Sequence, residues 1–363
     1  MNKRFIIAGG GTGGHIFPAI AIANAIKLKM PDAVFLFVGA KGKMEMEKVP
    51  KAGYAIEGLD IAGFNRSSLL KNIGLPYKLF LSFLQVRHIF KKFKPDAVIG
   101  VGGYSSFPVL RFAQSRGIKT FIHESNSFAG KSNILLGKNA TRIFVATPGM
   151  EKFFPAAKIT VSGNPIRSAI ANSRVSRNEA LQFFGLDVAK QTVLVVGGSL
   201  GAASINEALL NGLDAFDKNN LQLIWQTGKV NAARYAAAAT GKKNIWVNDF
   251  IQEMEYGYAA ADVIVSRAGA MTVAEISVVA KPAVLVPFPF AAEDHQTANA
   301  MQLVNAGAAL IVKDAEAAAS LVSTVTGLAL DPAAQEELMK QIRQFGRVDA
   351  DQLIANEILK MIA

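Results

Sequence analysis

The chain has 363 residues, about twice the usual length of a single domain, so two domains are expected. With 51% hydrophobic and 18% charged residues it is not an intrinsically disordered protein, and without cysteine it has neither disulfides nor thiolate sites. The net charge of +11 favours anionic partners: nucleic acid, phosphorylated substrates or an acidic membrane surface.

The N-terminus begins like a signal peptide, with Lys3-Arg4 followed by apolar Phe5–Ala8. Glycines then interrupt the apolar run before it reaches the length of a signal sequence. No segment approaches the roughly 18 to 20 apolar residues that span a bilayer. We therefore expect a cytoplasmic protein that is dissolved or peripherally bound to a membrane.

Short apolar runs alternate with helical patterns through the first half. Helices are predicted at Pro18–Lys29 and Leu75–Phe93. The buried strands are predicted at Phe5–Ala8, Val34–Val38, Ala97–Val101, Lys119–Ile122 and Arg142–Ala146. Continuously apolar strands separated by helices indicate a parallel sheet that is covered on both faces.

The same pattern restarts in the second half. A strand at Thr192–Val196 leads into the glycine-rich Gly197–Gly201 and then a helix from Ala202. The predicted fold is α/β, with two Rossmann-like doubly wound parallel-sheet domains facing a cleft. The predicted domains are residues 1–163 and 164–345, with a final helix in 346–363 that returns to the N-terminal domain.

The first glycine loop, Gly9–Gly14, precedes His15 and a helix whose first turn is predicted to contain Pro18. Glycines permit close approach, and a helix N-terminus offers free amides, so the loop suits a diphosphate. A dinucleotide fingerprint begins in the same way. It also requires an acidic residue at the end of the second strand, and Val38 is followed by Gly39-Ala40-Lys41 instead, which disfavours an NAD-dependent oxidoreductase.

A second constellation lies near residue 270. Strand Val263–Val265 precedes a turn at Gly269, and the helix beginning near Ala270 offers amides to a phosphate. Glu275 lies inside that helix, where its carboxylate could accept hydrogen bonds from ribose hydroxyls. The next strand, Ala283–Val286, leads to Asp294 and Gln296, which are suitable partners for sugar hydroxyls.

Several motifs in this order resemble the MurG family of peptidoglycan N-acetylglucosaminyltransferases across essentially the whole chain. They are Gly10–His15 with Pro18, Gly102-Gly103-Tyr104, His123-Glu124-Ser125-Asn126, Gly163–Arg167, Gly197–Gly201, Ser266–Glu275 and Asp294-His295-Gln296. The resemblance implies a GT-B fold and inverting transfer of N-acetylglucosamine from UDP-GlcNAc. The implied acceptor is undecaprenyl-diphosphate-linked N-acetylmuramyl-pentapeptide, so the product is the disaccharide lipid precursor of the cell wall.

The resemblance also assigns roles to individual residues. Glu275 would hold the ribose, Gln296 the GlcNAc hydroxyls, and Ile251 the uracil, mainly through its backbone. The nucleotide and its phosphates would be bound by Ser199, Arg167 and the helix start formed by Ala270, Met271, Thr272, Val273 and Ala274. Thr12, Gly13, Gly14 and Asn126 would reach the donor sugar or its phosphates. The family often has glutamine where this chain has Ser125.

Direct displacement requires a base near the acceptor hydroxyl. His15 is the first choice, with capping or diphosphate contact as its alternative role, and Glu124 is the rival base. Asp349 and Asp351 have the spacing of a metal–diphosphate motif, but capping of the final helix explains them better. The prediction is a transferase without metal or other cofactor.

Apolar and cationic residues are concentrated in Ser68–Lys94. We expect Leu69, Leu70 and Ile73 to contact an anionic membrane, whereas the helix from Leu75 onward is expected to be largely core. Gly102, Gly103 and Tyr104 could hold the acceptor diphosphate; a plain tight turn is the alternative. These features predict peripheral attachment to the cytoplasmic face of the cell's inner membrane, with other cell-wall synthesis proteins as candidate partners.

Alternative functions share parts of this pattern. They are transfer to another lipid acceptor, epimerisation of UDP-GlcNAc, and noncatalytic binding of a nucleotide sugar. Nucleic acid is disfavoured as a partner, because the chain lacks a basic aromatic RNA motif and its positive charges are dispersed.

Overall fold

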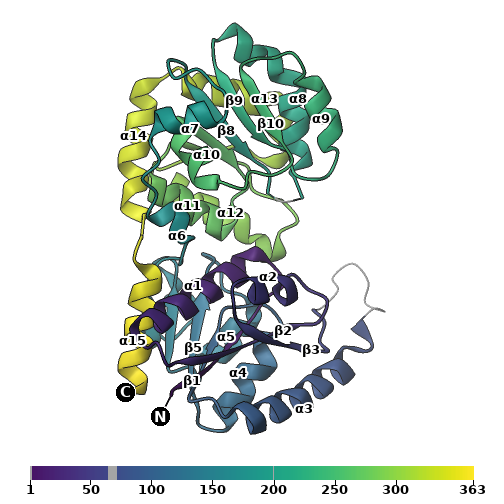
Figure 1. The fold of residues 1–363 in the computed structure, drawn as a ribbon, viewed down its shortest axis with the longest axis vertical. Coiled ribbons are helices and arrows are strands. Elements are labelled where there is room, and N and C mark those ends of the chain that lie inside the picture. Colours follow the sequence, from purple (N-terminus) through teal and green to yellow (C-terminus); the bar gives the residue numbers. More distant parts are fainter. Residues whose placement is uncertain (1, 64–71, 199) are drawn as a thin grey trace. The chain divides into compact units, whose positions relative to one another are not determined.

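The computed structural model describes residues 2–63, 72–198 and 200–363. They form two compact units, Met1–Arg167 with Asp349–Ala363 (unit 1) and Ser168–Val348 (unit 2) (Figure 1). Each unit contains one parallel β-sheet with helices on its faces. The predicted GT-B-like α/β fold with two parallel sheets is confirmed.

The sheet of unit 1 has the strand order β3-β2-β1-β4-β5-β6-β7. Its strands are β1 Arg4–Ala8, β2 Val34–Ala40, β3 Ala55–Leu59, β4 Ala97–Gly100, β5 Lys119–Glu124, β6 Arg142–Val145 and β7 Ile159–Val161. The order reverses between β1 and β4, where Phe5 pairs with Ala97. In doubly wound sheets, ligands bind at the carboxyl ends of the strands beside such a reversal.

Alternation along β1 creates two separate cores in unit 1. Phe5 and Ile7 pack on one face and Ile6 and Ala8 on the other, because successive side chains of a strand point in opposite directions. The helices of unit 1 are α1 Gly13–Lys29, α2 Glu45–Lys51, α3 Leu75–Phe93, α4 Ser106–Ser115, α5 Lys131–Gly137 and α15 Ala350–Ile362.

The C-terminal helix α15 packs beside α1 in unit 1 (Figure 1). Ile354 and Ile358 are fully buried in the same core cluster as Phe5 and Ile7. Lys3 Nζ donates to the Ile362 carbonyl oxygen over 3.0 Å, which places a positive charge at the negative end of the helix dipole. Asp349 occupies the predicted N-cap position of α15, but its side chain makes no capping hydrogen bond; Asp351 Oδ1 accepts instead from the Gln352 amide over 2.8 Å.

Unit 2 contains a sheet with the order β10-β9-β8-β11-β12-β13. Its strands are β8 Thr192–Val196, β9 Gln222–Gln226, β10 Ile245–Asn248, β11 Val263–Ser266, β12 Ala283–Leu285 and β13 Leu310–Ile311. Its helices are α6 Ser168–Ala171, α7 Arg177–Phe183, α8 Ala203–Lys218, α9 Ala232–Ala238, α10 Met254–Ala260, α11 Ala270–Val279, α12 His295–Val304, α13 Ala317–Ala329 and α14 Pro332–Ile342.

Helix α1 begins earlier than predicted. It starts at Gly13, so Pro18 lies inside the helix rather than in its first turn. Proline has no amide hydrogen to donate to the carbonyl four residues earlier, which belongs to Gly14. The hydroxyl of Ser125 donates to that carbonyl instead, over 3.4 Å. Ser125 therefore compensates in part for the hydrogen bond that Pro18 removes from the helix.

Candidate active site

Two glycine loops pack against each other at the carboxyl ends of β1 and β4. A Cβ on Gly103, whose φ is +83°, would lie 2.6 Å from the Gly10 carbonyl oxygen. A Cβ on Gly9 would lie equally close, at 2.6 Å, to the Gly102 carbonyl oxygen. Such distances are too short for any side chain, so glycine is what allows the two loops to meet.

His15 lies in the first turn of α1, directly above this junction. Its Nδ1 is 2.9 Å from the Gly10 carbonyl oxygen and 3.4 Å from Thr12 Oγ1. A carbonyl oxygen only accepts, so in the neutral ring Nδ1 carries the hydrogen and Nε2 carries the lone pair. Nε2 faces Gly102, where a Cβ would come within 2.8 Å of it. The ring is thus oriented with its basic nitrogen against the second glycine loop.

His123 lies behind the loops and is fully buried. Its Nε2 is 3.4 Å from the Gly163 carbonyl oxygen and its Nδ1 is 3.4 Å from Ser125 Oγ. Burial is the main cause that lowers the pKa of His123 to about 4; the Gly163 carbonyl opposes the shift, and the neighbouring His15 adds to it. His123 is therefore neutral near pH 7 and serves as a packed hydrogen-bonding residue.

Glu124 is buried and its carboxylate is saturated with donors. Oε1 accepts from the backbone N–H of Asn126 at 3.1 Å and from Asn126 Nδ2 at 3.3 Å. Oε2 accepts from the Gly130 amide at 3.1 Å and from Asn133 Nδ2 at 2.8 Å. Four donors around one carboxylate hold the loop that carries Asn126 in place.

Tyr104 follows the second glycine loop, and its ring packs against Gly63. Burial raises the pKa of Tyr104, and the negative charge of Glu45 raises it further. The tyrosine is therefore a neutral hydroxyl near pH 7. Ser106 Oγ donates to the Gly103 carbonyl over 2.7 Å, which fixes the loop at the start of α4.

Unit 2 has a candidate site of its own at the N-terminus of α11. Gly269 is the N-cap and has no side chain to cap the amides of the first turn, where Ala270, Met271, Thr272, Val273 and Ala274 are all partly exposed. Glu275 is 5% exposed, and its Oε2 accepts a hydrogen bond from the Tyr258 hydroxyl over 3.0 Å. Tyr258 thereby fixes the carboxylate one turn behind the helix start.

Gln296 and Ile251, which are predicted to contact the UDP-sugar, already form hydrogen bonds within the protein. Gln296 Oε1 accepts from the Phe288 amide over 3.0 Å, so a sugar hydroxyl would meet the side-chain nitrogen instead. The Ile251 side chain is buried, and its amide donates to Gln226 Oε1 over 3.0 Å. Ile251 could offer a nucleobase its amide only if Gln226 were displaced.

Arg267 anchors the loop that follows β12. Its guanidinium pairs with Asp314 Oδ1 at 2.5 Å and donates to the Val286 carbonyl at 3.1 Å. It also lies over the ring of Phe288, 5.4 Å from the centroid. The arginine thus holds the segment whose amide contacts Gln296, rather than projecting as a free phosphate ligand.

The predicted site residues divide between the two units. Thr12, Gly13, Gly14, His15, Gly102, Gly103, Tyr104, Glu124 and Asn126 gather at the carboxyl edge of the first sheet, in unit 1. Ile251, Ala270–Glu275 and Gln296 belong to unit 2, whereas Arg167 is the last residue of the first stretch of unit 1. Ser199, Leu69 and Leu70 lie outside the described residues.

Sequence reasoning missed Glu45, Tyr258 and Gln226, each of which holds a predicted site residue or its loop through a hydrogen bond. The continuous apolar run Leu223–Trp225 could have marked Gln226 as a polar residue ending a buried strand. Nothing local distinguishes Glu45 from its exposed neighbour Glu47, because its burial depends on distant glycines.

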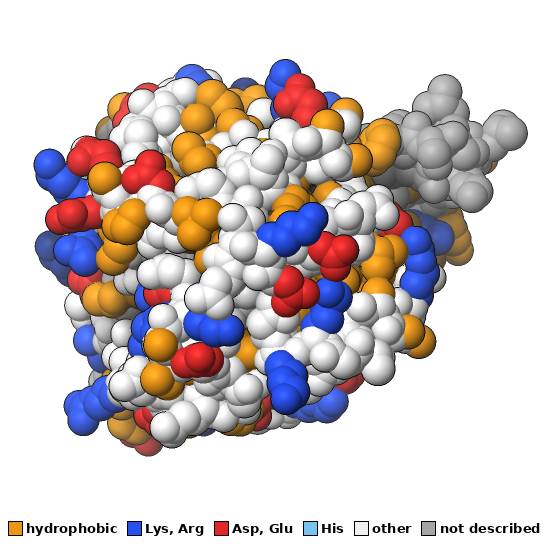
Figure 2. Space-filling view, turned by 90° about the horizontal axis from the view of Figure 1, so that it is seen from above, with side chains coloured by type: hydrophobic (Ala, Val, Ile, Leu, Met, Phe, Trp, Pro, Cys, Tyr) orange, Lys and Arg blue, Asp and Glu red, His pale blue; other side chains and the backbone are white. Residues whose placement is uncertain are grey.

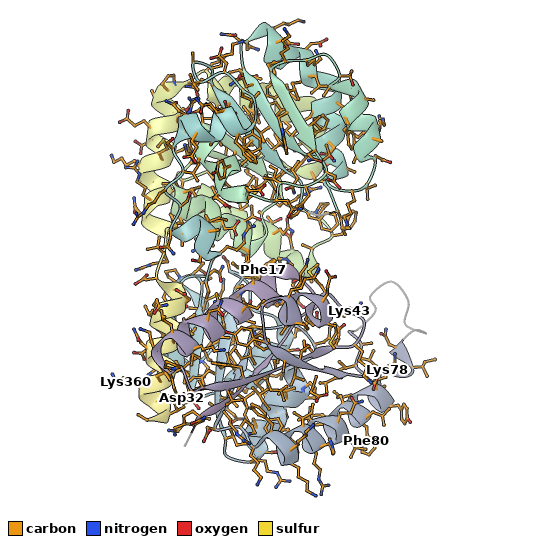
Figure 3. The ribbon with its side chains drawn as sticks, in the orientation of Figure 1. Phe17, Asp32, Lys43, Lys78, Phe80 and Lys360 are labelled. Atoms are coloured by element: carbon orange, nitrogen blue, oxygen red, sulfur yellow. The ribbon has the colours of Figure 1, made fainter. Side chains whose placement is uncertain are left out.

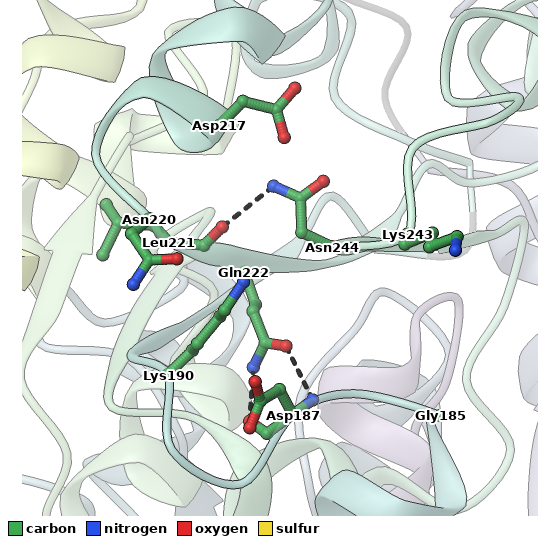
Figure 4. Close-up of a pocket in the computed structure, with 9 residues that line it drawn as sticks. All are labelled: Gly185, Asp187, Lys190, Asp217, Asn220, Leu221, Gln222, Lys243 and Asn244. Atoms are coloured by element: carbon green, nitrogen blue, oxygen red, sulfur yellow. Dashed lines mark hydrogen bonds between the residues drawn. The ribbon is translucent and has the colours of Figure 1, made fainter.

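A polar cavity of about 380 Å³ lies at the opposite edge of the second sheet, before the starts of β8, β9 and β10 (Figure 4). Gln222 exchanges hydrogen bonds of 2.7 and 2.8 Å with the backbone of Asp187, and Asn244 Nδ2 donates to the Leu221 carbonyl. These polar groups satisfy one another. The cavity also lies at the amino ends of the strands, away from the edge where doubly wound sheets bind ligands.

Helix α3 exposes an apolar face together with Ile73, two residues before the helix begins. Ile73 is 76% exposed, Tyr77 66%, Phe80 60% and Leu84 48%. Figure 3 shows Phe80 and Lys78 projecting outward from α3. The prediction that the helix is largely core from Leu75 onward is therefore wrong for its first half; its buried residues are Ser82, Val86, Ile89 and Phe90.

Cations flank this apolar face. A groove of about 430 Å³ is lined by the rings of Phe90 and Phe112 and by Arg87, Lys91, Lys94 and Arg116. On the face of the molecule drawn in Figure 2, by contrast, lysine and arginine are interspersed with aspartate and glutamate. Among the described residues no single helix has the length and apolarity to cross a bilayer, and only the pair Asp314–Ala329 and Pro332–Ile362, bent by 94°, meets those criteria jointly.

Sequence comparison identifies the family of both halves. Residues 5–145 match the Glycosyltransferase family 28 N-terminal domain and residues 192–354 match its C-terminal domain. A relative from Phocaeicola vulgatus is 50% identical over 99% of this chain and 96% of its own length. That relative is a UDP-N-acetylglucosamine–N-acetylmuramyl-(pentapeptide) pyrophosphoryl-undecaprenol N-acetylglucosamine transferase.

Solved structures agree with this result. The crystal structure of Acinetobacter baumannii MurG aligns with a TM-score of 0.79 at 29% identity, covering 99% of this chain and 100% of the other. A UDP-N-acetylglucosamine 2-epimerase aligns with a TM-score of 0.67 at 15% identity over 99% of this chain and 96% of the other, which shows a shared fold alone. The chain therefore belongs to glycosyltransferase family 28 and, within it, to the MurG transferases.

Proposed function

We propose that this protein transfers N-acetylglucosamine from UDP-GlcNAc to undecaprenyl-diphosphate-linked N-acetylmuramyl-pentapeptide. The observation that carries the proposal is the 50% identity to a transferase of that name over 99% of the chain. The acceptor's C4 hydroxyl attacks the anomeric carbon, the bond from that carbon to the diphosphate breaks, and UDP leaves with inverted configuration at the sugar. The hydroxyl proton passes to a base of the enzyme.

His15 is the proposed base. The Gly10 carbonyl holds Nδ1–H, so Nε2 is the nitrogen that would take the proton. Nε2 faces Gly102, and the Gly102-Gly103-Tyr104 loop is the proposed holder of the acceptor diphosphate. Glu124 is better suited to positioning Asn126 than to proton transfer, because four hydrogen bonds already occupy its carboxylate.

The donor is proposed to bind unit 2. The amides at the start of α11, Ala270 to Ala274, would stabilise the departing diphosphate together with Ser199 and Arg167. Glu275 would hold the ribose, Ile251 the uracil and Gln296 the GlcNAc hydroxyls. Thr12, Gly13, Gly14 and Asn126 would contact the sugar or its phosphates.

The apolar face of α3 supports peripheral attachment to the cytoplasmic face of the inner membrane. Ile73, Tyr77, Phe80 and Leu84 would enter the interfacial region while the flanking cations meet anionic headgroups. Leu69 and Leu70 are proposed to extend this surface. Such attachment would bring the glycine loops to an acceptor that is itself anchored in the membrane, where other cell-wall synthesis proteins are further candidate partners.

The test is formation of radiolabelled lipid product from UDP-GlcNAc and a short-prenyl diphosphate N-acetylmuramyl-pentapeptide, with EDTA present. His15→Ala is assayed in parallel with His88→Ala, which removes an exposed histidine of α3 that is not among the predicted site residues. We expect acceptor-dependent product from the wild type and from His88→Ala. We expect His15→Ala to lose about 100-fold or more in kcat while still binding UDP.

Different failures have different meanings. If UDP-GlcNAc binds but no lipid product forms, the assigned acceptor is wrong, and other lipids and epimerisation of the free donor are the next assays. If His15→Ala keeps the wild-type kcat, His15 is not the base although the transferase assignment stands. If EDTA abolishes turnover and a divalent cation restores it, the metal-independent mechanism is wrong.

A further inference from the structure

A single peptide unit links Glu45 to His15. The carbonyl of Gly10 accepts from His15 Nδ1 at 2.9 Å, and the N–H of Gly11 donates to Glu45 Oε2 at 2.8 Å. These two groups belong to the same peptide plane, since the carbonyl of one residue and the N–H of the next share one amide. A trans amide directs them to opposite sides, so the plane is held from both ends.

Glu45 is built into this place. Its side chain is 1% exposed, and its second oxygen accepts from the Ala40 amide over 2.9 Å. A Cβ on Gly10 would lie 2.3 Å from its carboxylate carbon, and one on Gly39 would lie 2.4 Å from its Cγ. Two glycines from the ends of neighbouring strands thus make room for one carboxylate, which no ordinary surface glutamate requires.

Burial of a carboxylate is costly unless donors compensate it. Among the described residues no lysine or arginine forms an ion pair with Glu45, and its compensation comes from the Gly11 and Ala40 amides. A hydrogen bond to a charged acceptor is stronger than one to a neutral acceptor. The negative charge therefore polarises the Gly10–Gly11 amide, which makes the Gly10 carbonyl a better acceptor for the histidine.

We propose that Glu45 is a positioning residue of the transferase, which acts through the Gly10–Gly11 peptide to hold His15 with Nδ1 protonated and Nε2 available as the base. The proposal rests on the proposed function, because it deepens the role assigned there to His15. Its logic is that of a carboxylate orienting a histidine, with one backbone amide placed between the two side chains. Glu45 itself touches neither donor nor acceptor in this role.

Glu45→Gln is the informative change, because glutamine has the same shape but offers one acceptor and one donor. Its NH₂ group must then face the N–H of either Gly11 or Ala40, so one of the two hydrogen bonds is lost. Glu47→Gln is the matched control. Glu47 lies two residues along α2, is 60% exposed in its side chain, and pairs with Lys51.

The first measurement is steady-state kinetics with UDP-GlcNAc and the short-prenyl acceptor. We expect Glu45→Gln to lower kcat by about 10- to 100-fold while the KM for UDP-GlcNAc stays within about twofold. Glu47→Gln should match the wild type in both. An unchanged kcat for Glu45→Gln, or a loss of UDP affinity in proportion to activity, would overturn the positioning role.

The second measurement is the ¹⁵N NMR signature of the His15 ring, assigned by comparison with His15→Ala. The wild type is expected in the Nδ1–H tautomer, and Glu45→Gln in a mixture with Nε2–H. A wild-type ring in the Nε2–H tautomer overturns the proposal even if Glu45→Gln does not fold. Because NMR needs no turnover, it also separates a failure of this proposal from a failure of the proposed function.

Discussion

Tyr258 donates its hydroxyl hydrogen to Glu275 Oε2 over 3.0 Å, and both side chains are buried. The bond ties α10 to α11 directly behind the helix start that is proposed to bind the donor. This hydrogen bond restricts the rotamers of Glu275 before the donor binds. The carboxylate therefore loses less conformational entropy when it meets a ribose hydroxyl. Tyr258 should therefore contribute to donor affinity without contacting the donor.

Tyr258→Phe removes this hydroxyl while keeping the ring. We expect the KM for UDP-GlcNAc to rise about 3- to 10-fold with kcat within twofold, because the lost hydrogen bond is worth about 1 kcal/mol. Tyr256→Phe is the control, since the Tyr256 hydroxyl donates to Glu179 Oε1 on the exposed side of the same helix. A fall in kcat at constant KM, or an equal rise in KM for Tyr256→Phe, would contradict the assignment.

His123 should make the stability of the protein depend on pH. Its pKa is lowered from 6.5 to about 4 by burial, so the unfolded chain binds a proton more readily than the folded one between those values. The stabilisation from the neutral ring is complete above pH 6.5 and is lost as the pH falls toward 4. The total loss is about 3 kcal/mol in the free energy of unfolding, which urea titrations at several pH values would measure.

His123→Gln keeps hydrogen-bonding capacity but cannot be protonated. Its unfolding free energy should be lower than that of the wild type at pH 7, yet should fall less steeply between pH 6.5 and 4. His88→Gln, at an exposed position, is expected to leave the wild-type slope unchanged. A slope for His123→Gln as steep as that of the wild type would show that other groups cause the acid sensitivity.

The apolar face of α3 should determine binding to anionic vesicles. Replacing Tyr77, Phe80 and Leu84 together with serine removes most of the exposed apolar area, and we expect vesicle affinity to fall about 10-fold or more. Turnover of a water-soluble short-prenyl acceptor should not change. Leu330→Ser removes an apolar side chain that is 53% exposed in unit 2 and serves as the control.

Sedimentation with vesicles of phosphatidylglycerol and phosphatidylethanolamine measures this affinity. The change of Leu69, Leu70 and Ile73 to serine tests the neighbouring segment in the same assay. If both triple variants bind these vesicles as the wild type does, the membrane surface lies elsewhere.

Ser125 and Pro18 should be energetically coupled through the Gly14 carbonyl. Ser125→Ala is expected to cost about 1 kcal/mol of unfolding free energy, because the carbonyl loses its donor. In a Pro18→Ala background, the amide of residue 18 can donate to Gly14 as in an ordinary helix, and the cost of Ser125→Ala should be smaller. Equal costs in the two backgrounds, measured by urea unfolding, would show that the 3.4 Å contact contributes nothing.

The strands that carry the site could be predicted from local pattern. Phe5–Ala8, Val34–Val38 and Thr192–Val196 are apolar runs, and they correspond to β1, β2 and β8. Parallel strands buried on both faces must be apolar throughout, so the signal is contained in the segment itself. The positions of the glycine loops could be predicted for a similar reason, since a glycine cluster directly after an apolar run marks the end of a strand.

Local pattern failed where two preferences competed. Pro18 favoured a helix beginning nearby, whereas α1 begins at Gly13 and carries the proline inside. The helix tolerates it because Ser125, more than one hundred residues away, supplies a donor to the freed carbonyl. The same limit applied to α3, whose apolar residues were expected in the core although Phe80 and Leu84 are exposed.

The sequence by itself determined the α/β class, the two-sheet organisation and the family, because apolar runs, glycine clusters and motif order are properties of the chain alone. Only the tertiary structure decided what each polar group does. Glu45 and Gly11 are 34 residues apart, and nothing near Glu45 in the sequence predicts that its carboxylate is buried beneath the glycine loop. A charged group is buried only where the fold brings donors to it, and those donors come from strands that meet only in the folded sheet.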